Sequence, residues 1–392
     1  MKSSGKNLIM AGKIAHAVKA SGGRAFYVGG CVRDEVLGRF GKDIDIEIHG
    51  LTEKKLAEIL DGLGERLTMG ASFGIFGLKH YTLDIVMPRS SSGDVAPFIG
   101  FREAARRRDF TMNALMKDVM TGEILDYFGG VNDINNKIIR HVDDETFLSD
   151  PLRVFRAARF SAALGFEIDE ATQKICGGAD VSGIAPERIF GELETVLLKT
   201  SSPLRFFHEL GKMGQLDFWF PEIKKTIPSL IDISEETKNK SSFPLGFMMS
   251  LICSSLSLND TSSLLARITN DNHITKYVMS MAGLLGELRR LSADEADDIP
   301  FMRVFDESVC PDDLALLAET LSGKSLSSML HLYHQRMSQP YVTGGDIKAL
   351  GVPQSPLIGE ALRHVHGLRL AGVPKDVQLR EAMNYIKGVN HD

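Results

Sequence analysis

FYVGGCVRDEVLGRFGKDIDIEIHG, residues 26–50, is the stretch that decides the fold. The apolar run AFYV at 25–28 ends in two glycines and predicts a strand followed by a tight turn. A helix beginning near Cys31 would point its free N–H groups at an anion such as phosphate, although two glycines alone also fit a plain turn. DIDIEIH at 43–49 alternates with period two and predicts a second strand.

Two carboxylates share one face of this second strand. Because residues i and i+2 of a strand point to the same side, Asp43 and Asp45 present their carboxylates together. Such a pair repels itself unless a cation lies between, and Mg²⁺ prefers carboxylate, phosphate and water oxygens. Asp84 lies in the apolar run LDIVM, on a strand expected beside the first, and would complete a two-metal site. For an isolated DID, a solvated polar face is the alternative.

The chain divides by pattern into an α/β head and a long helical remainder. Further strands are predicted in the head at 81–87 and, around a Thr-Gly turn, within 114–128, with a helix at 52–63 capped by Thr52. From Glu145 the apolar period becomes helical. Helices are predicted at 152–166, ended by Gly165, and at 186–199, 202–214 and, after a turn, within 343–352. Residues 222–242, rich in Lys, Ser, Thr and Glu, suggest an inter-domain connection.

Composition excludes several classes of protein. The formal net charge of −6 over 392 residues argues against a protein that coats nucleic acid nonspecifically, although local arginine clusters such as RRRDF at 106–110 can still bind it. No apolar run approaches the ~18 residues of a membrane span, and the N-terminus has no clear export signal, so we expect a cytoplasmic protein. The cysteines, which show no CxxC spacing and predict neither zinc nor disulfides, are Cys31, Cys176, Cys253 and Cys310.

An ordered set of motifs carries a family resemblance. GG-x-VRD is followed by DIDIE, RRRDFTMNAL, FGGVNDINNKIIRHV, DPLRVFRAARFSAALGF and PERIFGEL. This set resembles the class II tRNA nucleotidyltransferase and bacterial poly(A) polymerase superfamily, and VTGGDIKALGVPQSPLIGEALRHVHGLRLAG resembles the tail of bacterial CCA-adding enzymes. The resemblance implies an α+β, polymerase beta-like nucleotidyltransferase head at 1–142, then an all-α neck at 143–200, body at 201–330 and tail at 331–392. It also implies Mg²⁺ as cofactor, and tRNA, CTP and ATP as partners.

The resemblance also assigns roles within the head. Asp43 and Asp45 would be the metal ligands, and Asp84 the third catalytic carboxylate. The phosphates of the incoming nucleotide would meet Gly30 and Arg33. Arg108 would bind the nucleotide, and Asp109 would accept a hydrogen bond from the ribose 2′-hydroxyl. Without the resemblance, a solvated charge run would explain the arginines at 106–108 equally well.

In the neck, Asp150 and Arg153 would form a protein template for the base. C and A both place an exocyclic amino donor beside a ring-nitrogen acceptor, so a carboxylate and a guanidinium complement both. U and G place a carbonyl oxygen where the amino group would be, and the carboxylate rejects it. The alternative for Asp150-Pro151 is a helix cap and first turn. Arg156 and Arg159 follow Arg153 at three-residue steps, so they lie on one side of the same predicted helix. They would reach nucleotide or tRNA phosphates.

Several functions remain open at this point. The expected reaction is addition of CMP and AMP to the tRNA 3′ end, with release of pyrophosphate. The segment PRSSSGDVAPFIGFREAA, 88–105, is shorter than the charged, flexible segment of many CCA-adding relatives, which favours addition of CC alone as an alternative. A-addition, poly(A) synthesis, an inactive tRNA-binding relative and nucleotidylation of a small molecule are further alternatives. The long helical half argues against a small-molecule substrate.

Overall fold

The structure, a computed structural model, describes residues 2–39, 44–68, 75–90, 93–200, 202–227, 232, 234–291 and 298–389. The chain forms two compact units, Met1–Trp219 and Phe220–Asp392. The break falls just before the segment expected to be a connection, and that segment instead contains the short helices α11 (Pro221–Lys224) and α12 (Glu235–Lys240). The finer division into head, neck, body and tail stays a prediction.

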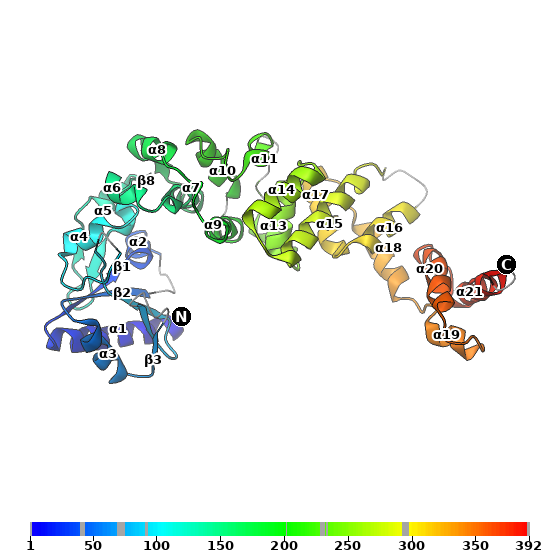
Figure 1. The fold of residues 1–392 in the computed structure, drawn as a ribbon, viewed down its shortest axis with the longest axis horizontal. Helices are drawn as coiled ribbons and strands as arrows, with labels where there is room; N and C mark the ends of the chain where they lie inside the picture. The colour runs from blue at the N-terminus through cyan, green and yellow to red at the C-terminus, as the bar shows by residue number, and fades with distance from the viewer. Residues whose placement is uncertain are drawn as a thin grey trace. The chain divides into compact units, whose positions relative to one another are not determined.

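A seven-stranded mixed sheet forms the head of the first unit, in the order β3-β4-β5-β2-β1-β6-β7 (Figure 1). Its strands are β1 (Arg24–Val28), β2 (Ile44–His49), β3 (Arg66–Thr68), β4 (Ile75–Leu78), β5 (Leu83–Val86), β6 (Met116–Asp118) and β7 (Ile124–Leu125). The strands predicted in 25–28, 43–49, 81–87 and 114–128 are confirmed, except that Asp43 lies outside the described residues. The β3–β4 hairpin was not predicted.

The two faces of this sheet differ in chemistry. One face is apolar and packs against α1 (Lys2–Ala20) and α3 (Glu53–Asp61), with a core that includes Ile14, Ile46 and Ile85. The other face carries Phe26 and Val28 beside the polar side chains of β2, because directly paired residues of neighbouring strands point to the same side. The period-two pattern of β2 therefore divides its isoleucines from its acidic residues, as expected.

Local signals explain where the elements begin and end. The Thr52 side chain accepts a hydrogen bond from Lys55 N and caps α3, as predicted. Gly165 ends α7 (Leu152–Leu164) with φ of 71°, a left-handed conformation that a residue with Cβ rarely adopts. The remaining helical elements of the first unit are α2 (Gly30–Val36), α4 (Phe101–Arg106), η1 (Thr111–Asn113), α5 (Gly130–Asn135), α6 (Asp144–Leu148), α8 (Glu170–Gly177), α9 (Pro186–Lys199) and α10 (Pro203–Lys212).

After the head the first unit is helical apart from one small exception. The short strands β8 (Ile138–Ile139) and β9 (Glu167–Ile168) pair in parallel where the head meets the helices. The helices predicted at 152–166, 186–199 and 202–214 are confirmed as α7, α9 and α10. α7 lies between β9, α9 and α10, and its Phe155 and Ala158 are fully buried.

The described part of the second unit is helical. Its longer elements are α13 (Pro244–Cys253), α14 (Leu258–Ile268), α15 (Asn272–Leu288), α16 (Ile299–Glu307), α17 (Pro311–Ser322), α18 (Ser327–Ser338), α19 (Gly344–Ala349), α20 (Pro356–Leu370) and α21 (Lys375–Val389). Thr343 caps α19 in a capping box with Asp346, which confirms the helix predicted in 343–352. The last three helices share a small core around Ile347 and Ala361.

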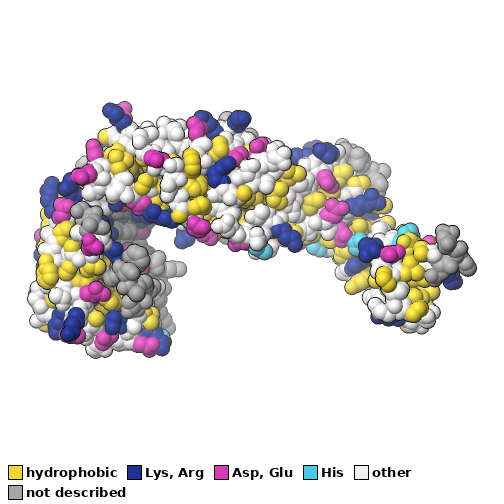
Figure 2. Space-filling view, viewed as in Figure 1, with side chains coloured by type: hydrophobic (Ala, Val, Ile, Leu, Met, Phe, Trp, Pro, Cys, Tyr) yellow, Lys and Arg dark blue, Asp and Glu magenta, His cyan; other side chains and the backbone are white. Residues whose placement is uncertain are grey.

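The visible face of the molecule shows no coat of one charge (Figure 2). Positive and negative side chains are interspersed on the visible face of both units, as Figure 2 shows, in keeping with a formal net charge of −6. In the part of the chain that the structure describes, no helix is both long and apolar enough to cross a membrane.

Candidate active site

A cleft of about 730 Å³ opens in the first unit between the polar face of the sheet and α7. It is lined by Gly29, Gly30, Cys31, Arg33, Asp34, Asp45, Arg107, Arg108, Asp109, Asn113, Asp150, Leu152, Arg153, Arg156, Arg159, Phe160 and Arg188. The structure thus brings together Asp45 and every residue predicted to bind the nucleotide. Asp84 is not part of this lining, and Asp43 lies outside the described residues.

The turn between β1 and α2 forms one wall of the cleft. Gly29 has φ of 69°, and a Cβ added there would lie 3.5 Å from Arg108 Nη1 and 3.6 Å from Asp45 Oδ2. The glycine therefore keeps the backbone close to both groups. Gly30 begins α2, and Arg33 donates hydrogen bonds to Asp34 Oδ1 at 2.7 Å and Asn113 Oδ1 at 2.9 Å.

Asp45 and Asp84 are neighbours across two parallel strands. They are register partners on β2 and β5, so their side chains leave the same face of the sheet at the strand spacing of about 4.8 Å. Asp45 is half-buried and Asp84 is exposed. Carboxylate oxygens are the ligands that Mg²⁺ prefers, so this pair suits that ion. Among the described residues, which omit Asp43, no group of three His, Cys, Asp or Glu side chains is close enough to hold a metal.

Arg108 is held by a buried acid. Its Nη2 lies 2.7 Å from Glu47 Oε2, and His49 Nε2 lies 2.8 Å from Glu47 Oε1. Burial alone would raise the pKa of Glu47, but the Arg108 charge and the His49 hydrogen bond outweigh it and hold that pKa below its usual range. Glu47 is therefore an anion inside the head, two residues after Asp45 on the same face of β2.

Asp109 is buried, and its acceptor sites are occupied. Oδ1 accepts from Phe110 N at 2.8 Å and from Asn113 Nδ2 at 2.9 Å, and Oδ2 accepts from Arg156 Nη2 at 2.6 Å. Burial would raise the pKa of Asp109, but Arg156 and these hydrogen bonds lower it. The Asn113 amide also accepts from Arg33, so it connects the β1–α2 wall to α7 through Asp109.

Asp150 and Arg153 face the cleft, and within the described residues their side chains do not pair with each other, although Arg153 N donates to the Asp150 carbonyl oxygen at 3.0 Å. Asp150 pairs with Arg188 Nη2 at 3.0 Å. Arg153 Nη2 donates to the carbonyl oxygen of Arg107 at 2.7 Å, and Nη1 donates to that of Thr146 at 2.5 Å. Asp150 lies one residue before the capping position of α7, and its Oδ1 is 3.4 Å from Leu152 N, so its capping contribution is weak.

Arg156 and Arg159, the two further arginines of α7, both lie close to the carboxylate of Glu192 on α9. Arg159 pairs with Glu192, and Arg156 Nη1 lies 3.8 Å from the same carboxylate. The Phe160 ring lies under three guanidinium groups, with Arg159 4.1 Å, Arg33 5.2 Å and Arg156 5.5 Å from its centroid. Such contacts keep planar cations ordered where a ligand would need them.

Arg107 differs from most of the other arginines of the cleft. Within the described ranges its guanidinium forms no ion pair, whereas Arg33, Arg108, Arg156 and Arg159 each pair with a carboxylate. Burial lowers the pKa of Arg107, and the nearby Arg89 guanidinium lowers it further. Arg107 thus lacks the carboxylate partner that these four arginines have.

Sequence reasoning missed several residues that line the cleft or hold its arginines from behind. Glu47, Glu192 and Phe160 hold or support cationic groups there, and Arg107 and Arg188 line the cleft without having been predicted as site residues. The one local signal was the position of Glu47, at i+2 from Asp45, because it predicts the same face of the strand. No local signal predicts a partner far away in the sequence.

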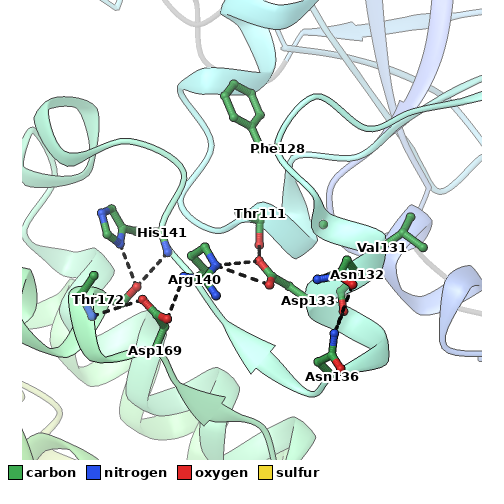
Figure 3. Close-up of polar contacts among 12 residues, drawn as sticks. Thr111, Phe128, Val131, Asn132, Asp133, Asn136, Arg140, His141, Asp169 and Thr172 are labelled. Carbon is green, nitrogen blue, oxygen red and sulfur yellow. Dashed lines mark hydrogen bonds and ion pairs between the residues drawn. The ribbon is translucent and has the colours of Figure 1, made fainter.

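A second polar network joins the head to the helices (Figure 3). Arg140 Nη1 donates to Asp169 Oδ1 at 2.7 Å, and its Nε donates to the buried Asp133 Oδ2 at 3.2 Å. Thr111 Oγ1 also donates to Asp133, at 2.7 Å. A Cβ on Gly130 would lie 2.2 Å from the Thr111 carbonyl oxygen, so only glycine fits where α5 begins. Gly129, the capping residue before α5, has φ of 76°.

The head is similar to a known family of protein domains. Residues 25–140 match the family described as "Poly A polymerase head domain". This match, with the relatives that follow, confirms the resemblance to the class II tRNA nucleotidyltransferase and poly(A) polymerase superfamily.

Similar proteins carry CCA-related names. The chain is 37% identical over 215 residues to the multifunctional CCA protein of Haemophilus ducreyi, covering 50% of each chain. It is 34% identical over 217 residues to that of Pasteurella multocida, covering 51% of this chain and 50% of the relative. The chain therefore spans about half the length of these curated relatives.

Solved structures establish the fold over nearly the whole chain. The Bacillus stearothermophilus CCA-adding enzyme in complex with CTP matches with a TM-score of 0.74 at 22% identity, covering 97% of this chain and 98% of that one. The Thermotoga maritima CCA-adding enzyme complexed with tRNA matches with a TM-score of 0.73 at 18% identity, covering 97% and 98%. The predicted fold, an α+β head followed by helices, is thereby confirmed.

Proposed function

We propose that this chain adds CMP and AMP, taken from CTP and ATP, to the 3′ end of tRNA. The observation that carries the proposal is one cleft that joins Asp45 on the sheet to Asp150 and Arg153 at the start of α7. A carboxylate on the sheet suits phosphoryl chemistry, and the acid–arginine pair suits a base with an amino group beside a ring nitrogen. The names of the relatives with CCA activity agree with this assignment.

In the proposed reaction the primer 3′-hydroxyl attacks the α-phosphate of the nucleotide. A new P–O bond forms, the bond between the α- and β-phosphates breaks, pyrophosphate leaves, and the hydroxyl loses its proton. Asp43 and Asp45 would hold Mg²⁺, which would supply charge neutralisation at the phosphates and activation of the hydroxyl, with Asp84 as the third catalytic carboxylate. Gly30, Arg33 and Arg108 would hold the triphosphate on the wall formed by the β1–α2 turn.

Base selection would use groups that are already held in place. Asp150 would accept from the exocyclic amino group of C or A, and Arg153 would donate to the ring nitrogen. Because Arg188 pairs with Asp150 and two carbonyls anchor Arg153, both groups are ordered before the base arrives. Asp109 would recognise the ribose 2′-hydroxyl only by sharing an acceptor site that Arg156 or Asn113 now uses.

The test is end-sequencing of tRNA that lacks its CCA end, after incubation with the protein, Mg²⁺, and CTP and ATP together or separately. We expect CCA with both nucleotides and CC with CTP alone. CC with both nucleotides would favour the CC-adding alternative, to which the short segment 88–105 points. No incorporation by the folded protein would overturn the proposal and favour an inactive tRNA-binding relative. The cytoplasmic location stays a prediction.

A further inference from the structure

One buried acid beside the cleft has no part in the proposed reaction. Glu47 lies on the same face of β2 as Asp45, yet it is only 6% exposed and does not line the cleft. An acid buried in a sheet is costly unless charged or polar partners compensate it. Glu47 has two such partners, Arg108 and His49, and each contacts a different carboxylate oxygen.

His49 fixes the orientation of this carboxylate. A carboxylate only accepts hydrogen bonds, so the short contact from His49 Nε2 to Glu47 Oε1 places a hydrogen on Nε2. The Nδ1 atom is buried and has no hydrogen-bond partner among the residues that the structure describes. The ring is packed edge-on against Phe26 at 5.6 Å and Phe101 at 5.0 Å between centroids. In the described part of the chain the ring therefore hydrogen-bonds only to Glu47 Oε1, which leaves the second oxygen of Glu47 for Arg108.

Arg108 in turn lines the cleft beside the turn between β1 and α2. Its Nη2 is used by Glu47, and its Nη1 and Asp45 Oδ2 both lie near Gly29, 3.5 Å and 3.6 Å from where a Cβ on that residue would be. Glu47 is behind the guanidinium, because it is buried and absent from the lining, whereas Arg108 lines the cleft. An arginine held in this way is already ordered, so binding a phosphate group costs it little further side-chain entropy.

We propose that Glu47 is a positioning residue that, itself oriented by His49, fixes the Arg108 guanidinium for the triphosphate of the incoming nucleotide. This inference rests on the proposed function of the cleft as a nucleoside triphosphate site. The inference and the net charge of the site predict opposite effects of removing the Glu47 carboxylate on nucleotide binding. Removing a negative charge near the site would by itself strengthen the binding of an anion, whereas loss of the tether weakens it.

The test measures the dissociation constants of CTP and CMP by calorimetry for the full chain and its variants. With Glu47→Gln we expect CTP to bind about tenfold more weakly, equivalent to about 1.4 kcal/mol, and CMP to change much less. When Arg108→Ala is already present, Glu47→Gln should cause no further loss, because the acid acts through the arginine. Glu47→Asp, which retains the charge on a shorter stem, gives a second variant should the first fail to fold.

Asp118→Asn provides the matched control. Asp118 is another buried carboxylate of the same sheet, 5% exposed and 2.6 Å from Arg24 Nη2, but it lies outside the cleft. This variant should leave CTP binding unchanged. Tighter or unchanged CTP binding by Glu47→Gln, or an equal further loss in the Arg108→Ala background, would overturn the inference alone. Failure of the unmodified protein to bind CTP would overturn the proposed function as well.

Discussion

Replacing Asp109 with Asn should destabilise the first unit by about 2–3 kcal/mol. The Asn side chain keeps the oxygen that accepts from Phe110 N and Asn113, but it turns an amide N–H₂ toward the Arg156 guanidinium. Breaking a buried ion pair by removing one partner costs about 3–5 kcal/mol. The Arg156 side chain is 34% exposed, so water replaces part of the lost contact and reduces the cost.

The chain contains its own reporter for this measurement. Its single tryptophan, Trp219, is buried in the first unit, and its Nε1 donates to the carbonyl oxygen of Val181 at 2.9 Å. Tryptophan fluorescence during urea unfolding should therefore follow the first unit. We expect the midpoint for Asp109→Asn to fall by about 1 M urea. Asp150→Asn, which breaks the exposed pair with Arg188, is the control and should cost less than about 1 kcal/mol.

The pH dependence gives this prediction a sign. The pKa of Asp109 is lower in the folded protein than in the unfolded chain, where it is about 3.9. Its ionisation therefore stabilises the fold above that unfolded value, and this stabilisation is lost as the pH falls through the lower, folded pKa. The difference between the protein and Asp109→Asn should be constant from pH 5 to 8 and should shrink below about pH 4. A difference under 1 kcal/mol at neutral pH, or one that grows on acidification, would refute the reasoning.

Three further outcomes are expected. Asp45→Asn should lower nucleotide incorporation on the order of 10³-fold, as for other lost electrostatic contacts in a transition state, while tRNA affinity in a filter-binding assay stays unchanged; an active variant would contradict the metal role. Arg153→Ala should reduce discrimination of CTP and ATP against UTP and GTP by about 10²-fold in single-nucleotide incorporation, and unaltered selectivity would exclude Arg153 as a template. Gly165→Ala should cost about 1–2 kcal/mol in urea unfolding, because φ there is 71°; a neutral effect would mean that α7 can end differently.

Local signals in the sequence predicted much of this fold. Thr52, Gly165 and Pro186 each mark a helix boundary where the structure has one, because caps and breakers act over a few residues. The α1 helix was missed, since Gly5 and Gly12 interrupt it and weaken its pattern. It is stabilised by packing on the sheet, and tertiary packing of this kind is not visible in a local window.

The candidate site also contains residues that the sequence predicted and residues that it did not. Period-two alternation placed Asp45 on the polar face of β2, and the motifs placed Arg108 and Arg153 near a nucleotide. The partners that hold these groups were beyond prediction. Glu47 meets an arginine sixty-one residues later, and Glu192 meets Arg159 from another helix. Such pairs depend on how distant segments meet, which one sequence without an alignment does not specify.

The parallel pairing of β2 with β5 limits which changes in chain length this protein tolerates. No tight turn sets the register between these strands, since α3, β3 and β4 lie between them along the chain. A residue inserted or deleted in a connecting loop leaves both strands in place, whereas one inside β5 before Asp84 would turn its carboxylate to the apolar face. Natural relatives and laboratory libraries should therefore vary in length around this strand and hardly ever within it.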